Sequence, residues 1–230
     1  MLSKLAVSLL VTSTIAASAE TATPRPECPN IHVFGARHTT ATDDYGLAKE
    51  LVNAIVETHP GATAERIDYP AQGGSTDIFA WSAQTGVRAV THQVTSFVNR
   101  CPDTQIVLVG YSQGAEIIDD AMCGGPDPTV NISSTEPPLS SEIGSHVKAI
   151  VWMGNPRHTI GAPFNLGTAS ASGTRPRSEN LSCLPYTDII QSYCDQGDRV
   201  CTDGDSWEVH GSYAAKYTYN ALEFVNERLY

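Results

Sequence analysis

An apolar run that breaks into a serine between two glycines constrains this chain most. The four residues Ile106-Val107-Leu108-Val109 suit a strand buried on both faces. The motif Gly-Tyr-Ser-Gln-Gly follows directly at 110–114, and apolar residues then recur at helical spacing at Ile117, Ile118 and Ala121. Side chains two positions before or after the serine would collide with the backbone of a tight turn. The pattern therefore predicts a strand, a sharp turn that carries Ser112, and a helix.

A serine on such a turn is the arrangement of a nucleophile elbow. The amides at the start of the following helix would point at the same spot, where they could stabilise negative charge on a substrate carbonyl. The alternative is a surface Ser-Gly turn, which does not explain the buried strand before it. We predict Ser112 as a nucleophile.

The first 19 residues are typical of a secretory signal peptide. Lys4 precedes an apolar segment over 5–16, and Ala17-Ser18-Ala19 has the small-x-small pattern of a cleavage site. This segment is too short to span a bilayer, and no other stretch reaches the ~18 apolar residues needed. We expect residues 1–19 to be removed, and residues 20–230 to form one secreted, extracellular catalytic domain that is monomeric and does not bind membranes.

The chain carries a formal charge of −11. This argues against nucleic acid or an anionic membrane as a partner, because both need clustered Lys and Arg. A neutral polysaccharide or a small neutral ester remains compatible.

Six cysteines follow the predicted signal peptide: Cys28, Cys101, Cys123, Cys183, Cys194 and Cys201. An even number in a secreted protein predicts three disulfides, and the short loop between Cys194 and Cys201 makes that pair close to forced. The absence of a C-x-x-C pair argues against a zinc site. Asn131 and Asn180 begin glycosylation sequons on predicted loops.

Strands and helices alternate along the chain. Apolar patterns predict strands over 30–34, 64–69, 106–109 and 147–154. Helical spacing predicts helices over 47–55 and 83–99, one after Ser112, and one from about Gly211. This alternation is typical of a mainly parallel sheet covered by helices on both sides.

A serine nucleophile needs a base held by a carboxylate, and in such folds the order is Ser, Asp, His. After Ser112 the histidines are His146, His158 and His210. His146 precedes a predicted strand, which puts it at the wrong end of the sheet, whereas His158 follows that strand. His210 precedes the last helix, so spacing favours His210 without excluding His158.

Asp198 lies inside the loop between Cys194 and Cys201, twelve residues before His210. A disulfide around a carboxylate can fix its direction where no strand does so. We favour Asp198 as the acid. Asp195, Asp203 and Asp205 are competitors that spacing leaves open.

The chain resembles the fungal cutinase and acetylxylan esterase family, carbohydrate esterase family 5, from about Cys28 to Tyr230. The motifs that carry the resemblance are Val107–Ala115, Cys123-Gly124-Gly125, Met153–Arg157, Ser192–Asp195 and Ala221–Val225. The resemblance implies a three-layer α/β/α sandwich with a five-stranded parallel sheet, an α/β-hydrolase without a lid. It also implies esterase activity without a metal or cofactor.

The same resemblance assigns roles to residues. Ser112 matches the nucleophile, Asp198 the acid and His210 the base, and the amides of Gln113 and Thr39 match the oxyanion hole. It also implies disulfides Cys28–Cys101, Cys123–Cys183 and Cys194–Cys201.

Within the family, the motifs Ala36-Arg37-x-Thr39-Thr40, Tyr69–Gly74 and Pro163–Gly167 look more like acetylxylan esterases than cutinases. The loop 202–209 is mostly polar, whereas a long acyl chain should favour an apolar rim. Trp207 in this loop could stack on a sugar ring, or it could be ordinary packing. Two features depart from the family: Gln72 stands where acetylxylan esterases often carry a cysteine, and Arg199-Val200 resembles neither branch.

We therefore expect a secreted esterase that removes acetyl groups from acetylated xylan, a plant cell-wall polysaccharide. One alternative is a cutinase-like esterase that hydrolyses the longer acyl esters of cutin. A remote alternative is a non-catalytic protein that binds plant cell wall.

Overall fold

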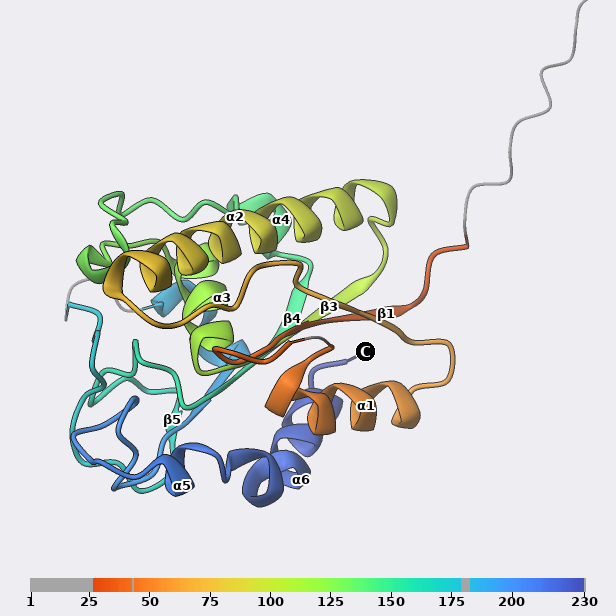
Figure 1. The fold of residues 1–230 in the computed structure, drawn as a ribbon. Coiled ribbons are helices and arrows are strands. Elements are labelled where there is room, and N and C mark those ends of the chain that lie inside the picture. Colours follow the sequence, from red (N-terminus) through yellow and green to blue (C-terminus); the bar gives the residue numbers. More distant parts are fainter. Residues whose placement is uncertain (1–26, 43, 179–182, 230) are drawn as a thin grey trace, which may run out of the picture.

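The computed structural model describes residues 27–229 except residue 43 and residues 179–182. The predicted signal peptide and the sequon at Asn180 therefore lie outside the described residues. Within them, the chain alternates strands and helices, as Figure 1 shows. No described helix is both long and apolar enough to cross a membrane.

All strand pairs of the central sheet are parallel, in the order β2-β1-β3-β4-β6-β5. The strands are β1 Ile31–Ala36, β2 Thr63–Arg66, β3 Gln105–Tyr111, β4 Val147–Met153, β5 Asn165–Leu166 and β6 Ile190–Tyr193. The expected five strands are wrong for the described residues, because the sheet has six. The additional strand is β5, two residues long, whose Asn165 and Leu166 extend the sheet beyond Ser192 and Tyr193 of β6.

Helices cover both faces of this sheet, which confirms the three-layer α/β/α arrangement. The α-helices are α1 Lys49–Thr58, α2 Thr76–Arg100, α3 Gln113–Cys123, α4 Ser141–Gly144, α5 Trp207–His210 and α6 Tyr213–Asn226. Short 3-10 helices lie at η1 Gly46–Ala48, η2 Pro128–Val130 and η4 Leu184–Ile189. In Figure 1, α2, α3 and α4 lie over one face of the sheet and α1 and α6 over the other.

The core consists of two apolar clusters separated by the sheet. Phe34 and Leu108 face the α2 and α3 side, whereas their neighbours Val33 and Val109 face the α1 and α6 side. Because successive residues of a strand point to opposite faces, a strand covered on both faces must be apolar at every position. This is why β3 reads as a continuous apolar run over 106–109 and β1 is interrupted only by the buried His32.

Helix α2 begins seven residues before the predicted helix over 83–99. Ser75 caps it, and its side chain accepts a hydrogen bond from the backbone N–H of Ile78. Ile78 and Trp81 in the first turns are exposed, so they do not continue the apolar stripe that marks the rest of the helix. The early start places the first turn of α2 beside the loop after β2.

Candidate active site

Ser112 stands at the carboxyl end of β3 on a strained turn. Its backbone has φ 55° and ψ −120°, a conformation that costs a non-glycine residue about 1–3 kcal/mol. A Cβ on Gly110 would lie 2.6 Å from the Gly114 carbonyl oxygen, and one on Gly114 would lie 2.6 Å from the Ala36 carbonyl carbon. The two glycines are therefore required by space, because the turn lies directly against β1.

A chain of hydrogen bonds joins the three residues that the sequence favoured. With its proton on Nδ1, His210 donates to Asp198 Oδ2 at 2.8 Å, and its Nε2 accepts from the Ser112 hydroxyl at 2.9 Å. All three side chains are buried, with Ser112 8% exposed at the surface. The arrangement lets His210 take a proton from Ser112 while Asp198 fixes the orientation of the imidazole.

The disulfide loop and helix α6 together hold the Asp198 carboxylate. Its Oδ1 accepts from the backbone N–H groups of Val200 and Cys201, at 2.6 and 3.0 Å, and Tyr213 donates to its Oδ2. Burial by itself would raise the pKa of Asp198, but the hydrogen bonds from His210, Tyr213 and Cys201 outweigh it and lower the pKa. The carboxylate is therefore ionised where it meets His210.

The other candidate acids have different partners. Asp195 accepts from Thr168, Tyr217 and Lys216, which tie the loop to α6 and to the segment after β5. Asp203 and Asp205 are exposed in the next loop, and Asp203 accepts from Gln196 and Thr202. Of these carboxylates, the structure brings only Asp198 to His210.

The loop that carries Thr39 is fixed by a buried arginine. Arg37 donates from its guanidinium to the carbonyls of Ala41, Ile67 and Tyr69, and the Tyr69 hydroxyl donates back to the Arg37 carbonyl at 2.5 Å. Thr39 itself lines the cleft that contains Ser112. The loop after β1 is thus held rigidly beside the nucleophile, a contact that sequence reasoning did not assign to Arg37.

Gln113, the residue after the nucleophile, is buried and tied to the loop after β2. Its Nε2 donates to the Gln72 carbonyl at 3.2 Å, its Oε1 accepts from Ser82 at 3.3 Å, and the Ser82 hydroxyl accepts from the Gln72 N–H at 2.9 Å. A ring of hydrogen bonds therefore holds this loop at Gln72. It also fixes the first turn of α3, which follows Ser112 directly.

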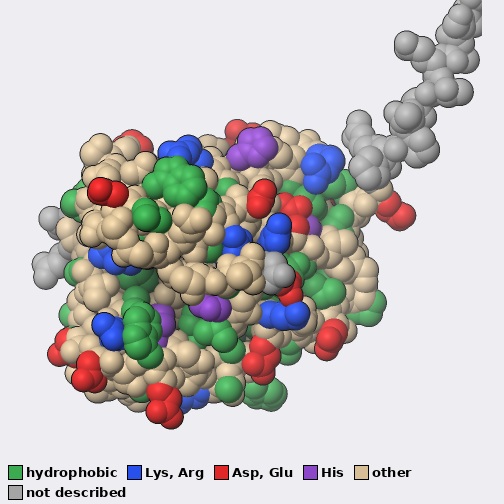
Figure 2. Space-filling view, in the orientation of Figure 1, with side chains coloured by type: hydrophobic (Ala, Val, Ile, Leu, Met, Phe, Trp, Pro, Cys, Tyr) green, Lys and Arg blue, Asp and Glu red, His purple; other side chains and the backbone are tan. Residues whose placement is uncertain are grey.

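Ser112 and His210 open into a cleft of about 720 Å³. Its lining residues come from the carboxyl ends of the strands and the loops that follow them: His38, Thr39, Thr40, Leu47, Gly73, Gly74, Phe79, Tyr111, Ser112, Thr174, Arg175, Val200, Trp207, His210 and Gly211. In Figure 2, hydrophobic, basic and histidine side chains adjoin one another around a hollow in the lower left of this face.

Arg175 lines one wall of this cleft, although the sequence analysis assigned it no role. Arg175 forms two hydrogen bonds to the buried carboxylate of Glu116, at 2.7 and 2.9 Å, and its guanidinium lies 4.6 Å from the centre of the Phe79 ring. Burial raises the pKa of Glu116 to about 7 although Arg175 opposes that shift. Glu116 lies one helical turn after Ser112, so the pair links the elbow helix to the cleft wall.

Trp207 lies at the mouth of the cleft and is 61% exposed. Its ring centre is 5.5 Å from that of His210, and the guanidinium of Arg199 lies 4.3 Å from the indole on which it rests. An indole so exposed beside the base is open to a ligand.

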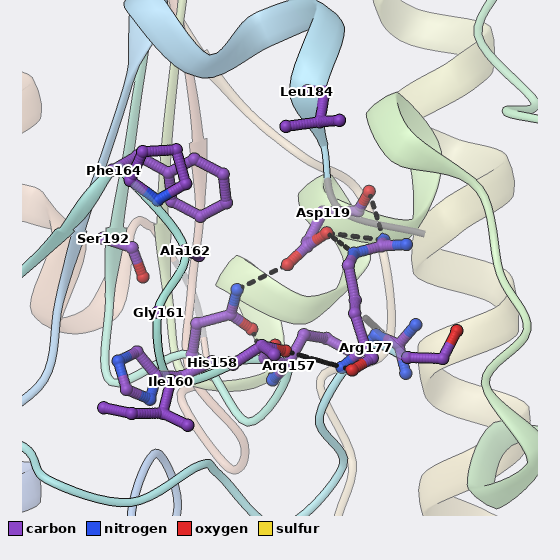
Figure 3. A pocket seen from close by; sticks show the side chains of 14 residues that line it. Asp119, Arg157, His158, Ile160, Gly161, Ala162, Phe164, Arg177, Leu184 and Ser192 are labelled. Atoms are coloured by element: carbon purple, nitrogen blue, oxygen red, sulfur yellow. Dashed lines mark hydrogen bonds and ion pairs between the residues drawn. The ribbon is translucent and has the colours of Figure 1, made fainter. Parts of the chain in front are cut away.

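The two other candidate histidines lie elsewhere. The carbonyl of His146 accepts from Ile106 N–H at the amino end of β3, opposite to Ser112. His158 lines a separate cavity of about 300 Å³, shown in Figure 3 with Asp119 and Arg177 on one side and Phe164 and Ser192 on the other. No hydrogen bond joins His158 to Ser112 or to a carboxylate within the described part of the chain.

Three disulfides join the six cysteines in the pairs that the resemblance implied: Cys28–Cys101, Cys123–Cys183 and Cys194–Cys201. The third closes the loop around Asp198. Asn131, the first sequon residue, is exposed after η2. Among the described residues, no group of three or more His, Cys, Asp or Glu side chains could hold a metal ion.

Comparison with known proteins gives close relatives over most of the chain. A family model described as cutinase matches residues 27–229. Acetylxylan esterase 2 of Talaromyces purpureogenus is 42% identical over 228 residues, 97% of each chain. Cutinase 11 of Verticillium dahliae is 46% identical over 209 residues, 89% of this chain and 70% of that protein. The solved catalytic core domain of acetyl xylan esterase from Trichoderma reesei is 45% identical, with a TM-score of 0.84 over 88% of this chain and 100% of that chain.

Proposed function

This chain belongs to the cutinase family, and we propose that it is a secreted serine esterase that removes acetyl groups from acetylated xylan. The observation that carries the proposal is the hydrogen-bond chain from Ser112 through His210 to Asp198 at the floor of an open cleft. The relatives named for acetyl xylan support the choice of substrate.

The proposed reaction is a two-step acyl transfer. His210 takes the proton of Ser112 as the serine oxygen attacks the ester carbonyl, and the backbone amides of Gln113 and Thr39 stabilise the oxyanion. As the tetrahedral intermediate collapses and the bond to the sugar oxygen breaks, the protonated His210 gives its proton to that oxygen, which leaves as a hydroxyl. Water, activated by His210, hydrolyses the acyl-enzyme and releases acetate. Asp198 stabilises the protonated imidazole in both steps.

The cleft wall favours a short acyl group. A long acyl chain that ran along this wall would lie against the Arg175 guanidinium and would have to remove it from water. The Glu116 carboxylate and the Phe79 ring hold that guanidinium in place, so it is not free to turn away. Threonines and glycines at positions 39, 40, 73 and 74 line the wall formed by the loops after β1 and β2. The exposed indole of Trp207 is suited to pack against a pyranose ring.

A cutinase-like activity on longer acyl chains is the second candidate. The relative Cutinase 11 supports it, as do the apolar side chains of Leu47, Phe79 and Val200 in the cleft. Each methylene of an acyl chain buried there would contribute about 0.8 kcal/mol. The two candidates therefore differ in how the rate changes with chain length.

The test measures hydrolysis of nitrophenyl esters from acetyl to octanoyl together with acetate release from acetylated xylan, each for the wild type and Ser112→Ala. We expect rates that fall steeply beyond acetyl, release of acetate from the polymer, and loss of both in Ser112→Ala. Rates that hold or rise with chain length, without acetate from xylan, would assign the protein to the second candidate. Activity that survives in Ser112→Ala would reject the mechanism.

Secretion and glycosylation belong to the same proposal. We propose that residues 1–19 direct export, which agrees with three disulfides in the mature chain. We propose Asn131 and Asn180 as glycosylation sites. Expression in a secreting fungal host, followed by N-terminal sequencing and peptide mass analysis, tests both.

A further inference from the structure

The charge distribution around the catalytic cleft differs from that of the whole chain. The chain has 25 acidic and 14 basic residues. Nevertheless, none of the described residues that line the cleft is an aspartate or a glutamate, whereas Arg175, His38 and His210 are among them. An acidic protein that keeps carboxylates out of its binding cleft is suited to a ligand that is itself negatively charged.

Arg199 adds a further positive charge at the cleft mouth. It follows Asp198 directly in the disulfide loop, and its side chain is exposed. Its guanidinium lies 4.3 Å from the centre of the Trp207 ring, and the preceding residue, Asp198, is the one that accepts from the His210 imidazole. Stacking on an indole fixes the guanidinium plane and leaves its N–H groups available at the edge.

Arg199 forms no ion pair with a carboxylate of the described residues. Arg175 is paired with Glu116, whereas no described carboxylate lies within 4.0 Å of the Arg199 guanidinium. The nearby Asp203 accepts instead from Gln196 and Thr202. The hydrogen-bond donors of the Arg199 guanidinium are therefore not engaged by a described carboxylate and can meet a ligand.

We propose that Arg199 and Trp207 form a subsite for a uronic acid residue of the polysaccharide, with the guanidinium bound to the sugar carboxylate and the indole packed against the ring. The inference rests on the proposed function and names the kind of xylan on which it acts: one whose acetylated sugars lie near acidic substituents. A planar guanidinium matches a carboxylate through two parallel hydrogen bonds. A neutral sugar at the same place could not form an ion pair with the Arg199 guanidinium.

The first experiment compares two matched acetylated xylo-oligosaccharides, one with a uronic acid substituent and one without. The quantity measured is the ratio of kcat/KM for the acidic and the neutral substrate. Arg199→Gln should lower this ratio about three- to fivefold, the upper part of the range for an ion pair near the surface, mainly through KM. The control Arg88→Gln removes one positive charge from an exposed position on α2 and should keep the wild-type ratio.

The second experiment measures binding without catalysis. Ser112→Ala is titrated calorimetrically with the acidic and the neutral oligosaccharide, and the titration is repeated with Ser112→Ala/Arg199→Gln. Tighter binding of the acidic ligand that depends on Arg199 supports the subsite.

The outcomes separate the two proposals. If neither oligosaccharide releases acetate, the proposed function fails, and the titration alone decides the subsite. If acetate is released but Arg199→Gln leaves the kcat/KM ratio unchanged, the subsite is overturned while the function stands. Equal affinity of Ser112→Ala for both ligands would also overturn the subsite.

Discussion

Tyr213 donates a hydrogen bond of 2.7 Å to Oδ2 of Asp198, the same oxygen that accepts from His210. The Tyr213 hydroxyl also accepts from the backbone N–H of Asp195 at 2.9 Å. The first residue of α6 therefore ties the disulfide loop to the candidate acid. This places Tyr213 as a positioning residue for the Asp198 carboxylate.

Removal of the Tyr213 hydroxyl should slow the reaction without abolishing it. Tyr213→Phe leaves Asp198 with its donors from His210, Val200 and Cys201, so we expect kcat to fall about three- to tenfold with little change in KM. Steady-state kinetics on nitrophenyl acetate measures this. The control Tyr217→Phe removes a hydroxyl that donates to Asp195 and should retain kcat. An equal loss in both variants would mean a general loosening of α6.

The two neighbouring aspartates should behave differently when neutralised. Asp198→Asn cannot accept from His210 as a carboxylate does, and we expect kcat to fall by about 10³ to 10⁴. Asp195→Asn should instead lower the melting temperature, because Asp195 is paired with Lys216 and hydrogen-bonded to Thr168. Kinetics and thermal unfolding on both variants check this. Near-full activity of Asp198→Asn would show that another carboxylate serves His210.

Of the four strands that the sequence predicted, β1, β3 and β4 are buried on both faces, whereas β2 is a partly exposed strand at the sheet edge. Strands β1, β3 and β4 are apolar at nearly every position because helices cover both sides of the sheet. Strand β6 was missed because Ile-Gln-Ser-Tyr is short and half polar, and β5 contributes only two residues at the edge. Strands β5 and β6 are defined by their backbone pairing with the neighbouring strand. Their sequences show no apolar periodicity that would predict a strand.

Spacing favoured His210 but could not exclude His158, because His158 follows the carboxyl end of β4. The choice depends on how the chain folds back after Asp198, where Gly204 N–H donates to the Asp198 carbonyl and α5 then carries His210 over Ser112. The pair of Arg175 and Glu116, 59 residues apart, likewise had no local motif. Contacts between distant loops are set by the tertiary structure, which a single sequence does not display.

The buried Glu116 predicts a pH dependence of stability near neutrality. Burial raises its pKa in the folded protein to about 7, above the ordinary value of 4.5. The folded state therefore holds this proton up to a higher pH, so the stabilisation is complete below the unfolded pKa and is lost as the pH rises through about 7.

Glu116→Gln removes this titration. Between about pH 5 and pH 8, its melting temperature should decline less with rising pH than that of the wild type. Thermal unfolding across this range measures the difference, and Glu57→Gln, at an exposed position on α1, controls for the loss of one charge. Parallel curves for wild type and Glu116→Gln would contradict the assignment.

We expect one disulfide to contribute mainly to stability and another to contribute mainly to activity. Cys28–Cys101 closes a loop of 73 residues, whereas Cys194–Cys201 spans 7. In the chain-entropy account, their loss costs about 4.5 and about 2.5 kcal/mol of unfolding free energy, respectively. The short bridge encloses Asp198, and its Cys201 N–H donates to that carboxylate. The long one joins the start of β1 to the end of α2, at the amino end of the sheet.

We therefore expect opposite rankings in two measurements. Replacing Cys28 and Cys101 by serine should lower the denaturant midpoint more, yet leave kcat near the wild-type value below the melting temperature. Replacing Cys194 and Cys201 by serine should lower the midpoint less, but reduce kcat at least about tenfold, because the direction of Asp198 is no longer fixed. Denaturant titration and kinetics on nitrophenyl acetate give both quantities for each variant. If kcat fell more in the variant with the lower denaturant midpoint, the short disulfide would contribute only to stability. The orientation of Asp198 would then depend on its hydrogen bonds alone.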